Sequence, residues 1–149
     1  SSSSHDLTFN HPVKELIWTG GVTIGNPGPE LGPTTPLGNV IDANSYTLKL
    51  NGQDRFSKRD EFHFGREQVW KYHTGNPCNI KDDEAGATVA VYSFALEPEK
   101  HQPSGTCNFS RIDTATLDLD TSSKPLFIYA VNYNVLKVEG GMGGLKYSN

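Results

Sequence analysis

The five histidines are the residues whose type could first support metal chemistry. They are His5, His11, His63, His73 and His101. No H-x-H or HExxH pair, the usual spacing of zinc ligands, occurs among them. His63 and His73 flank a possible helix at a spacing that places them near one face, but a zinc site there would need another ligand such as His101 or Cys78. The spacing therefore favours ordinary hydrogen-bonding histidines, and we expect no metal and no cofactor.

A nucleophilic site would need a serine, threonine or cysteine beside a base. The run Ser104 to Cys107 places two hydroxyls and a thiol near His101, but no G-x-S-x-G elbow is present. Glu97 and Glu99 stand at strand spacing, which is typical of a solvated face and not of an acid–base pair. Hydroxyls in such a Gly/Pro-rich turn commonly satisfy backbone groups. We expect that the protein is not an enzyme.

Charge and hydropathy exclude two further classes of function. The 149 residues include 13 basic and 17 acidic side chains, a formal net charge of −4, and no basic cluster is longer than Lys58-Arg59. Direct nucleic-acid binding is therefore not expected. No apolar run approaches the ~18 residues that a membrane span requires, so no membrane insertion is expected. Ser1 to Ser4 lack the pattern of a signal peptide and are interpreted as a linker or a truncated end.

Two covalent modifications remain open from the sequence. Cys78 and Cys107 could pair, but their spacing cannot establish a disulfide. Asn108-Phe109-Ser110 is an N-x-S sequon, so Asn108 is a possible glycosylation site.

The elements that must position these residues are mostly strands. Ser45 to Leu50 alternates cleanly and is followed by Asn51-Gly52, a strong signal for a tight turn. Ala87 to Leu96 is apolar on both faces, which predicts a strand in the centre of a sheet. Thr116 to Asp120 also alternates, and Leu126 to Val138 is the longest β-prone run.

Shorter segments complete the pattern. Leu7 to Phe9 and Val13 to Trp18 are β-prone, and Gly25 to Gly38 is rich in glycine and proline and predicts a surface loop. Ser57 to Tyr72 is the one plausible helix, with Ser57, Asp60 and Glu61 available near its start for capping. Many short strands separated by turns indicate a two-sheet sandwich or a jelly roll. We expect an all-β, eight-stranded antiparallel jelly-roll sandwich with one short helix in a loop.

Several segments, in the same order, resemble one protein family. The segment Tyr92 to Asp113, YSFALEPEKHQPSGTCNFSRID, closely resembles the signature stretch of major capsid proteins of nucleocytoplasmic large DNA viruses of the chlorovirus, iridovirus and mimivirus type. Asn10 to Trp18 resembles that family's entry into its second jelly roll, and Leu50 to Phe56 its LNGxDRF turn. Tyr72 to Thr74 resembles the close of its short helix, and Tyr147 to Asn149 its YSN finish.

The resemblance implies the second roll of a double-jelly-roll subunit. It implies a structural component of an icosahedral capsid, in which three subunits form a trimeric capsomer of pseudo-hexagonal outline. The implied partners are the other subunits of the homotrimer, neighbouring capsomers, and minor capsid and penton proteins, in the capsid shell of a virion assembled in the host cytoplasm. Residues 5–139 are expected to form the jelly roll, with a linker or truncated end at 1–4 and a C-terminal tail at 140–149.

Within the signature segment, a polar loop is the candidate assembly site. Pro98 and Pro103 rigidify it, polar side chains can satisfy its backbone, and Arg111 could form a bidentate pair with Asp113, Glu97 or Glu99. Such a loop could set the registry between subunits or brace its own domain. The residues proposed for it are Glu97, His101, Gln102, Pro103, Ser104, Gly105, Asn108, Arg111 and Asp113.

The alternative from the same residues is a carbohydrate- or receptor-binding β-sandwich. Exposed loops that carry Trp18, Trp70 and tyrosines could stack against sugar rings.

Overall fold

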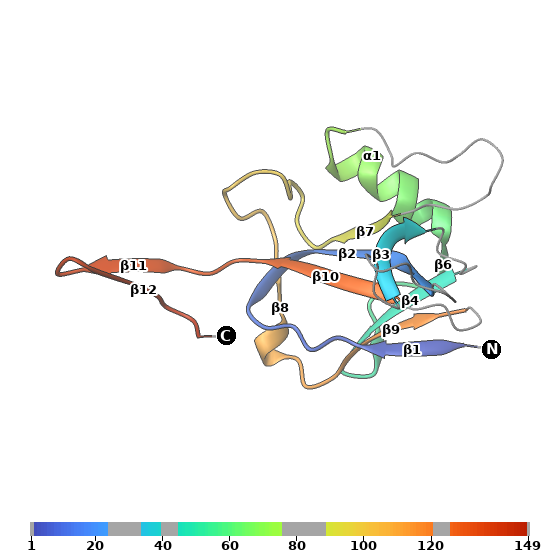
Figure 1. Cartoon of the computed structure of the whole chain (residues 1–149), viewed down its shortest axis with the longest axis horizontal. Helices are drawn as coiled ribbons and strands as arrows, with labels where there is room; N and C mark the ends of the chain where they lie inside the picture. The colour runs from blue at the N-terminus through green and yellow to red at the C-terminus, as the bar shows by residue number, and fades with distance from the viewer. Residues whose placement is uncertain (1, 24–33, 40–44, 76–88, 121–125, 149) are drawn as a thin grey trace, which may run out of the picture.

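A computed structural model of the chain describes residues 2–23, 34–39, 45–75, 89–120 and 126–148 (Figure 1). The strands run in two antiparallel sheets that face each other, with a separate hairpin at the C-terminal end. This arrangement confirms the expected all-β antiparallel sandwich. Among the described residues, no helix has the length and apolar character needed to cross a membrane.

The first sheet has the order β1-β9-β4-β5, with β6 also paired to β4. Its strands are β1 (Ser3–Asp6), β4 (Ser45–Leu50), β5 (Gln53–Asp54), β6 (Arg59–Asp60) and β9 (Ala115–Leu119). The predicted strands at 45–50 and 116–120 are thus confirmed. Between β4 and β5, Asn51 and Gly52 have φ values of 51° and 77°, as a tight turn with two left-handed residues requires.

The second sheet is built on the long strand β2, which pairs with four others. Its members are β2 (Pro12–Thr23), β3 (Thr34–Asn39), β7 (Val89–Ser93), β8 (Cys107–Asn108) and β10 (Leu126–Asn132). The β-prone run at 13–18 is confirmed inside β2. The predicted surface loop at 25–38 is wrong for its last residues, because β3 pairs there with the end of β2; residues 24–33 lie outside the described part.

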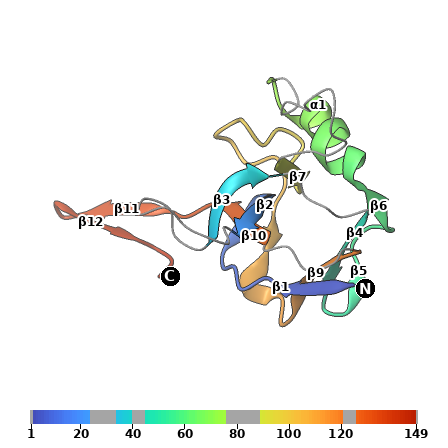
Figure 2. The same cartoon turned by 45° about the vertical axis from the view of Figure 1, so that its right-hand side comes forward.

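The helical segment covers β7 and explains its composition. It consists of a π-helical stretch η1 (His63–Glu67) followed by α1 (Gln68–Tyr72). The carboxylate of Asp60 accepts from the backbone N–H of His63 at 3.1 Å, so Asp60 provides the cap. β7 pairs only with β2 among the described strands, so the central position predicted for it is not found. Its apolar character on both faces instead reflects core contacts on one side and the helix on the other (Figure 2).

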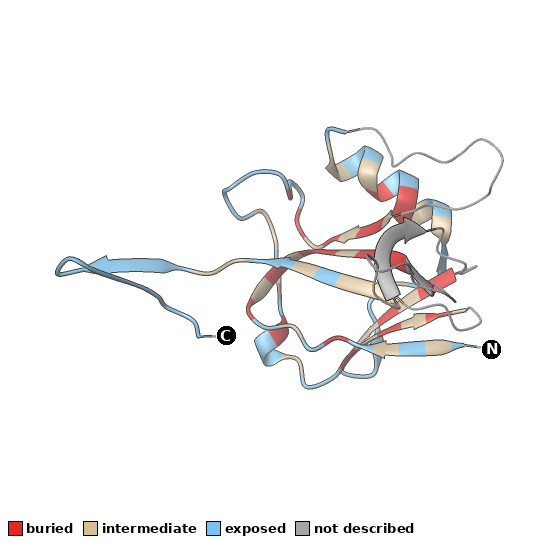
Figure 3. Ribbon diagram, viewed as in Figure 1, coloured by how far each residue is buried: buried red, intermediate tan, exposed pale blue. Residues whose placement is uncertain are grey.

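The core lies between the two sheets (Figure 3). At its centre, Trp18 from β2, Tyr46 from β4 and Phe64 from η1 are fully buried. Their ring centroids lie 5.4 Å apart for Trp18–Tyr46, 5.3 Å for Trp18–Phe64 and 5.4 Å for Tyr46–Phe64. One aromatic cluster therefore joins both sheets and the helix.

Both ends of the chain are more ordered than the sequence predicts. Ser3 and Ser4 lie in β1, inside the segment expected to be a linker, because they pair with Leu119 and Asp118 of β9. The expected tail at 140–149 contains β12 (Met142–Leu145), which pairs with β11 (Leu136–Glu139). Leu7 to Phe9, by contrast, form no strand.

Candidate functional site

The loop that follows β7 is closed at its base by Ser104. The backbone N–H of Glu97 donates to the Ser104 hydroxyl at 2.8 Å, and that of Leu96 donates to the Ser104 carbonyl at 3.4 Å. Farther along the loop, the ammonium of Lys100 pairs with the carboxylate of Glu97 at 2.8 Å. Because these contacts satisfy backbone groups that a loop would otherwise leave unpaired, the loop has a fixed start and end.

Gly105, the next residue, passes very close to the backbone of Phe94 and Ala95, which directly follow β7. Its φ is +142°, and a Cβ atom placed on it would lie 2.6 Å from the carbonyl oxygen of Phe94. An L-residue side chain does not fit here, so glycine is required both by the backbone conformation and by the available space.

The end of the signature segment is tied to two other parts of the domain. The Asn108 side chain accepts from the Ser110 N–H at 3.1 Å and so caps the short 3-10 helix η2 (Phe109–Arg111). The Ser110 hydroxyl accepts from the backbone N–H of His11 at 2.8 Å. The Asn51 side chain accepts from the Asp113 N–H at 2.9 Å. Asn108 is exposed, and its glycosylation stays a prediction.

The outer part of the loop is exposed. His101, Gln102 and Pro103 lie at its tip, and Arg111 is also exposed. Among the described residues, Arg111 forms no ion pair with Asp113, Glu97 or Glu99, so the expected bidentate pair is not found. Instead, Glu97 pairs with Lys100, and Glu99 contacts the residues just after the helix.

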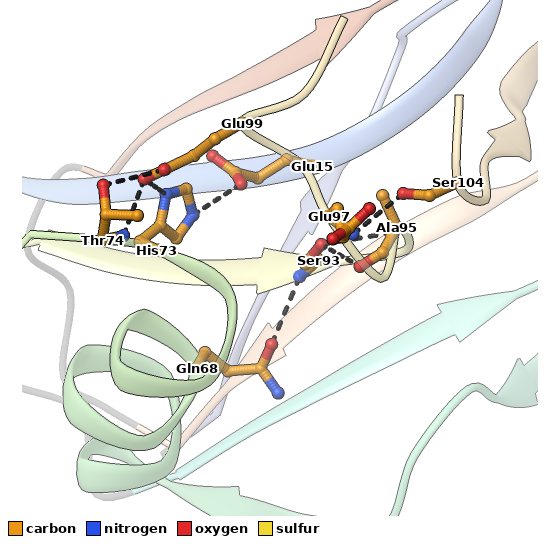
Figure 4. Close-up of polar contacts among 9 residues, drawn as sticks. All are labelled: Glu15, Gln68, His73, Thr74, Ser93, Ala95, Glu97, Glu99 and Ser104. Carbon is orange, nitrogen blue, oxygen red and sulfur yellow. Dashed lines mark hydrogen bonds and ion pairs between the residues drawn. The ribbon is translucent and has the colours of Figure 1, made fainter. Parts of the chain in front are cut away.

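A cluster of charged groups links the loop to β2 and to the end of α1 (Figure 4). His73 follows α1 directly; its Nε2 lies 2.7 Å from Oε2 of the buried Glu15, and its Nδ1 lies 3.2 Å from Oε1 of Glu99. The distance between His73 and Glu15 is that of an ion pair, but the geometry is not that of a hydrogen bond. Glu99 also accepts from the backbone N–H of Thr74 at 2.9 Å and from its hydroxyl at 2.8 Å. The His73 ring therefore lies between the two carboxylates, with one nitrogen facing each of them.

The pKa values of the two carboxylates in this cluster are shifted in opposite directions. Burial raises the pKa of Glu15, and the nearby His73 only partly offsets this effect. The hydrogen bonds from the Thr74 backbone and hydroxyl lower the pKa of Glu99. The cluster therefore combines a buried acid that resists ionisation with an exposed one that favours it.

Replacing Glu15 with glutamine should change how stability depends on pH. Because its pKa is raised in the fold, the folded state holds this proton more tightly than the unfolded chain does. Ionisation therefore costs stability as pH rises above the ordinary carboxyl range. We expect the free energy of unfolding of the wild type, relative to Glu15→Gln, to fall in urea titrations as pH rises above about 4, the ordinary carboxyl range.

The matched control for this prediction is Glu97→Gln. Glu97 is an exposed carboxylate of the loop after β7, with 54% of its side chain accessible. Glu97→Gln also removes one carboxylate but leaves Glu15 in place, so its stability relative to Glu15→Gln should still fall as pH rises. A wild type that gains stability relative to Glu15→Gln as pH rises would contradict the assignment.

The other residues considered for chemistry are dispersed. His63 pairs with Glu67 at 2.7 Å, away from His73, and His101 lies at the loop tip. Within the described ranges, no group of three or more His, Cys, Asp and Glu side chains is arranged to hold a metal ion. Burial raises the pKa of the Cys107 thiol. Cys78 lies outside the described residues, so the question of its pairing with Cys107 stays open.

The sequence therefore identified the loop but not the contacts that hold it in place. Glu97, Ser104, Gly105, Asn108 and Asp113 all contribute to bracing the segment within its own domain. The contribution of Glu15 was missed. The available signal was an acidic residue next to Lys14 in a β-prone strand whose other residues are apolar, and a carboxylate in such a strand is seldom buried unless a partner covers it.

Comparisons with known proteins give consistent matches. A family model described as large eukaryotic DNA virus major capsid protein matches residues 1–144. A major capsid protein of Pyramimonas orientalis virus is 43% identical over an alignment that covers 100% of this chain and 40% of that protein. The chain thus spans well under half the length of this relative.

Solved structures agree in fold. A crystal structure of VP54 from the virus PBCV-1, fitted into a reconstruction of the virophage Sputnik, matches with a TM-score of 0.76 and 34% identity. That match covers 100% of this chain and 46% of the other. A quasi-atomic model of the PBCV-1 capsid matches with a TM-score of 0.74, again with 34% identity and the same coverage. The expected jelly-roll fold is confirmed by these matches.

Proposed function

The chain belongs to the major capsid protein family of large eukaryotic DNA viruses, and on this premise we propose that it is a structural component of an icosahedral viral capsid. The observation that carries the proposal is the match over the whole chain to a protein in a quasi-atomic capsid structure, at 34% identity and a TM-score of 0.74. The names of its relatives, which are major capsid proteins, support a structural role.

The chain is proposed to be one roll of a larger subunit. It covers 40% of its Pyramimonas orientalis virus relative, which leaves room in such a protein for a second domain of similar size. The sandwich, which begins with β1 at Ser3 and ends with β10 at Asn132, then corresponds to the second of two consecutive rolls. Three such subunits form a pseudo-hexagonal capsomer, which contacts neighbouring capsomers and minor capsid and penton proteins in a shell assembled in the host cytoplasm.

The loop after β7 is proposed to serve assembly through its exposed tip. Its base is braced internally by Ser104 and Gly105, while His101, Gln102 and Pro103 lie exposed. A loop that is rigid at its base loses little conformational entropy when its tip is bound, which suits a contact that sets subunit registry.

The mass of the intact parent subunit in solution tests this function. We expect a particle of three subunits, each with two rolls, by analytical ultracentrifugation or light scattering. A monomeric parent with measurable affinity for sugars would contradict the capsid role. The coding sequence upstream of Ser1 gives an independent check, because it should encode another roll of roughly 200 residues, an ordinary domain size.

One observation favours a carbohydrate-binding module as the second candidate. Trp70 on α1 is 81% exposed. It borders a shallow hollow of about 540 Å³ together with Arg66, Glu67 and Lys71. An exposed indole beside charged groups is a suitable surface for stacking a sugar ring. Glycan binding by the chain that is lost in Trp70→Ala would support this candidate.

A further inference from the structure

The C-terminal hairpin is an arm that stands apart from both sheets. β11 and β12 are joined by Gly140 and Gly141, whose φ values are 58° and 78°. Figures 1 and 2 agree that the arm continues beyond the end of β10 and leaves the body of the domain. Apart from its base, it is covered by nothing in the described part of the chain, and every residue from 135 to 148 is exposed.

The base of the arm is fastened to the domain. The backbone N–H of Tyr133 donates to the carbonyl of Pro12 at 2.8 Å, and the Asn132 side chain donates to the carbonyl of Asn10 at 2.9 Å. The Asn134 side chain donates to the Tyr147 carbonyl at 3.0 Å and accepts from the Tyr147 N–H at 3.3 Å. The contacts of Asn132 and Tyr133 fix where the arm leaves the domain, and those between Asn134 and Tyr147 hold its two strands together.

One face of the arm is apolar, and the other, called the charged face, carries two charged residues together with the exposed Met142, which lies opposite Glu139. Leu136 pairs with Leu145, and Val138 with Gly143, so the side chains of Leu136, Val138 and Leu145 share the apolar face. Leu136 and Val138 are each 68% exposed and Leu145 is 60% exposed. On the opposite face, Lys137 and Glu139 form an ion pair at 2.7 Å. A two-stranded hairpin is marginal by itself in water, and a contiguous exposed apolar surface marks an interaction site.

A matching apolar strip lies on the outer face of β10. Ile128 and Ala130 point inward and pack against the core, so Tyr129 and Val131 point outward, and both are exposed. Tyr129 lies opposite the half-buried Ile17 of β2, which adds to the strip, whereas Val131 lies opposite Glu15, which is buried against His73 and marks the end of the strip on β2. Because the arm leaves along the direction of β10 and is fastened at its base, it points away from the strip of its own chain. A second copy can supply that strip.

We propose that the apolar face of the arm of one copy packs onto the outer face of β10 and β2 of a second copy. This contact rests on the proposed capsid function, in which copies of the chain lie side by side. It is a head-to-tail contact, since each copy gives an arm and receives one. Head-to-tail contacts close into rings when the rotation between copies allows it, and a trimer is such a ring.

Disulfide trapping between two different single-cysteine chains tests the contact. Both chains carry Cys78→Ser and Cys107→Ser; one adds Val138→Cys on the apolar arm face, and the other adds Tyr129→Cys on β10. Because a disulfide needs Cα atoms within about 7 Å, oxidation of the mixture should give at least about fivefold more mixed dimer than the control mixture. The control replaces Val138→Cys by Lys137→Cys, on the charged face of the same strand.

A second variant tests the apolar contact itself. Leu136→Ser with Leu145→Ser, added to the Val138→Cys chain, should remove the excess of mixed dimer, and an unchanged near-UV circular dichroism spectrum shows that the core is intact. Equal yields with Val138→Cys and Lys137→Cys, or no mixed dimer in either mixture, would overturn the proposal and leave the arm to another part of the subunit. The mass of the intact parent tests the capsid role separately, so a trimeric parent without selective trapping removes only the arm contact.

Discussion

Replacing Phe64 with alanine should lower the free energy of unfolding by about 3–5 kcal/mol, the usual cost of removing a fully buried aromatic ring. The ring is fully buried between Trp18 and Tyr46, with centroid distances of 5.3 Å and 5.4 Å. Its loss leaves a cavity at the point where both sheets and the helix meet. The helix should also separate more readily from β7, since Phe64 is the aromatic residue that anchors it in the central cluster.

The neighbouring Phe62→Ala is the matched control for this measurement. Phe62 belongs to the same helical segment but is 52% exposed, and its ring contacts Arg66 at 4.8 Å from the guanidinium carbon to the centroid. Its loss should cost no more than about 1 kcal/mol, the range of an exposed cation–π contact. Urea unfolding followed by tryptophan fluorescence measures both variants. Equal effects of the two substitutions would show that Phe64 does not anchor the helix.

The strands that the sequence predicted best are those with one buried and one solvated face. In β9, Ala115, Leu117 and Leu119 are buried and alternate with less buried residues, as in the sequence pattern. β4 follows the same rule through Tyr46 and Leu48. In such strands the burial of alternate side chains both creates the pattern and determines the register, so the sequence is informative.

Prediction failed where pairing partners decide the structure. β3 lies in a segment rich in glycine and proline, and it becomes a strand because β2 is long enough to pair with it. β7 is apolar on both faces, which led the sequence analysis to predict a strand in the centre of a sheet. In the structure, one of these faces is covered by the helix. The arm was taken for a tail because its glycines suggest flexibility, whereas Gly140 and Gly141 form the turn and Gly143 lies opposite Val138. Local composition does not report such distant partners.

The candidate site shows the same difference between what a local sequence pattern predicts and what distant contacts determine. Its residues were identified by a contiguous segment, so the loop from Glu97 to Asp113 was found. The contacts that tie this loop to the domain come from distant positions: His73 brings Glu15 and Glu99 together from β2 and the loop, and Asn51 reaches Asp113 from the other sheet. Only the fold places these positions side by side.

Gly105 is the residue of this loop whose role the structure defines most sharply. The sequence placed it among polar loop residues without a reason for glycine. In the structure, Ser104 closes the loop base on one side of Gly105, and the backbone of Phe94 and Ala95 lies directly against it on the other. A side chain at this position must therefore displace the chain just after β7, reopen the loop base, or both.

Gly105→Ala should accordingly lower the free energy of unfolding by about 3 kcal/mol, because backbone strain and a steric clash each cost about 1–3 kcal/mol.

Two further glycine-to-alanine variants separate the backbone strain from the steric clash. Gly52 has a φ of +77° with nothing within 4 Å of its added Cβ, so Gly52→Ala should show the backbone strain alone, about 1 kcal/mol. Gly144 has open space and no positive φ, so Gly144→Ala should be close to neutral. Urea unfolding of the three variants should give the order Gly105, Gly52, Gly144 from largest to smallest loss. If Gly105→Ala costs no more than Gly52→Ala, then the backbone of Phe94 and Ala95 does not pack tightly against Gly105, and the loop base is not the rigid support that the assembly role requires.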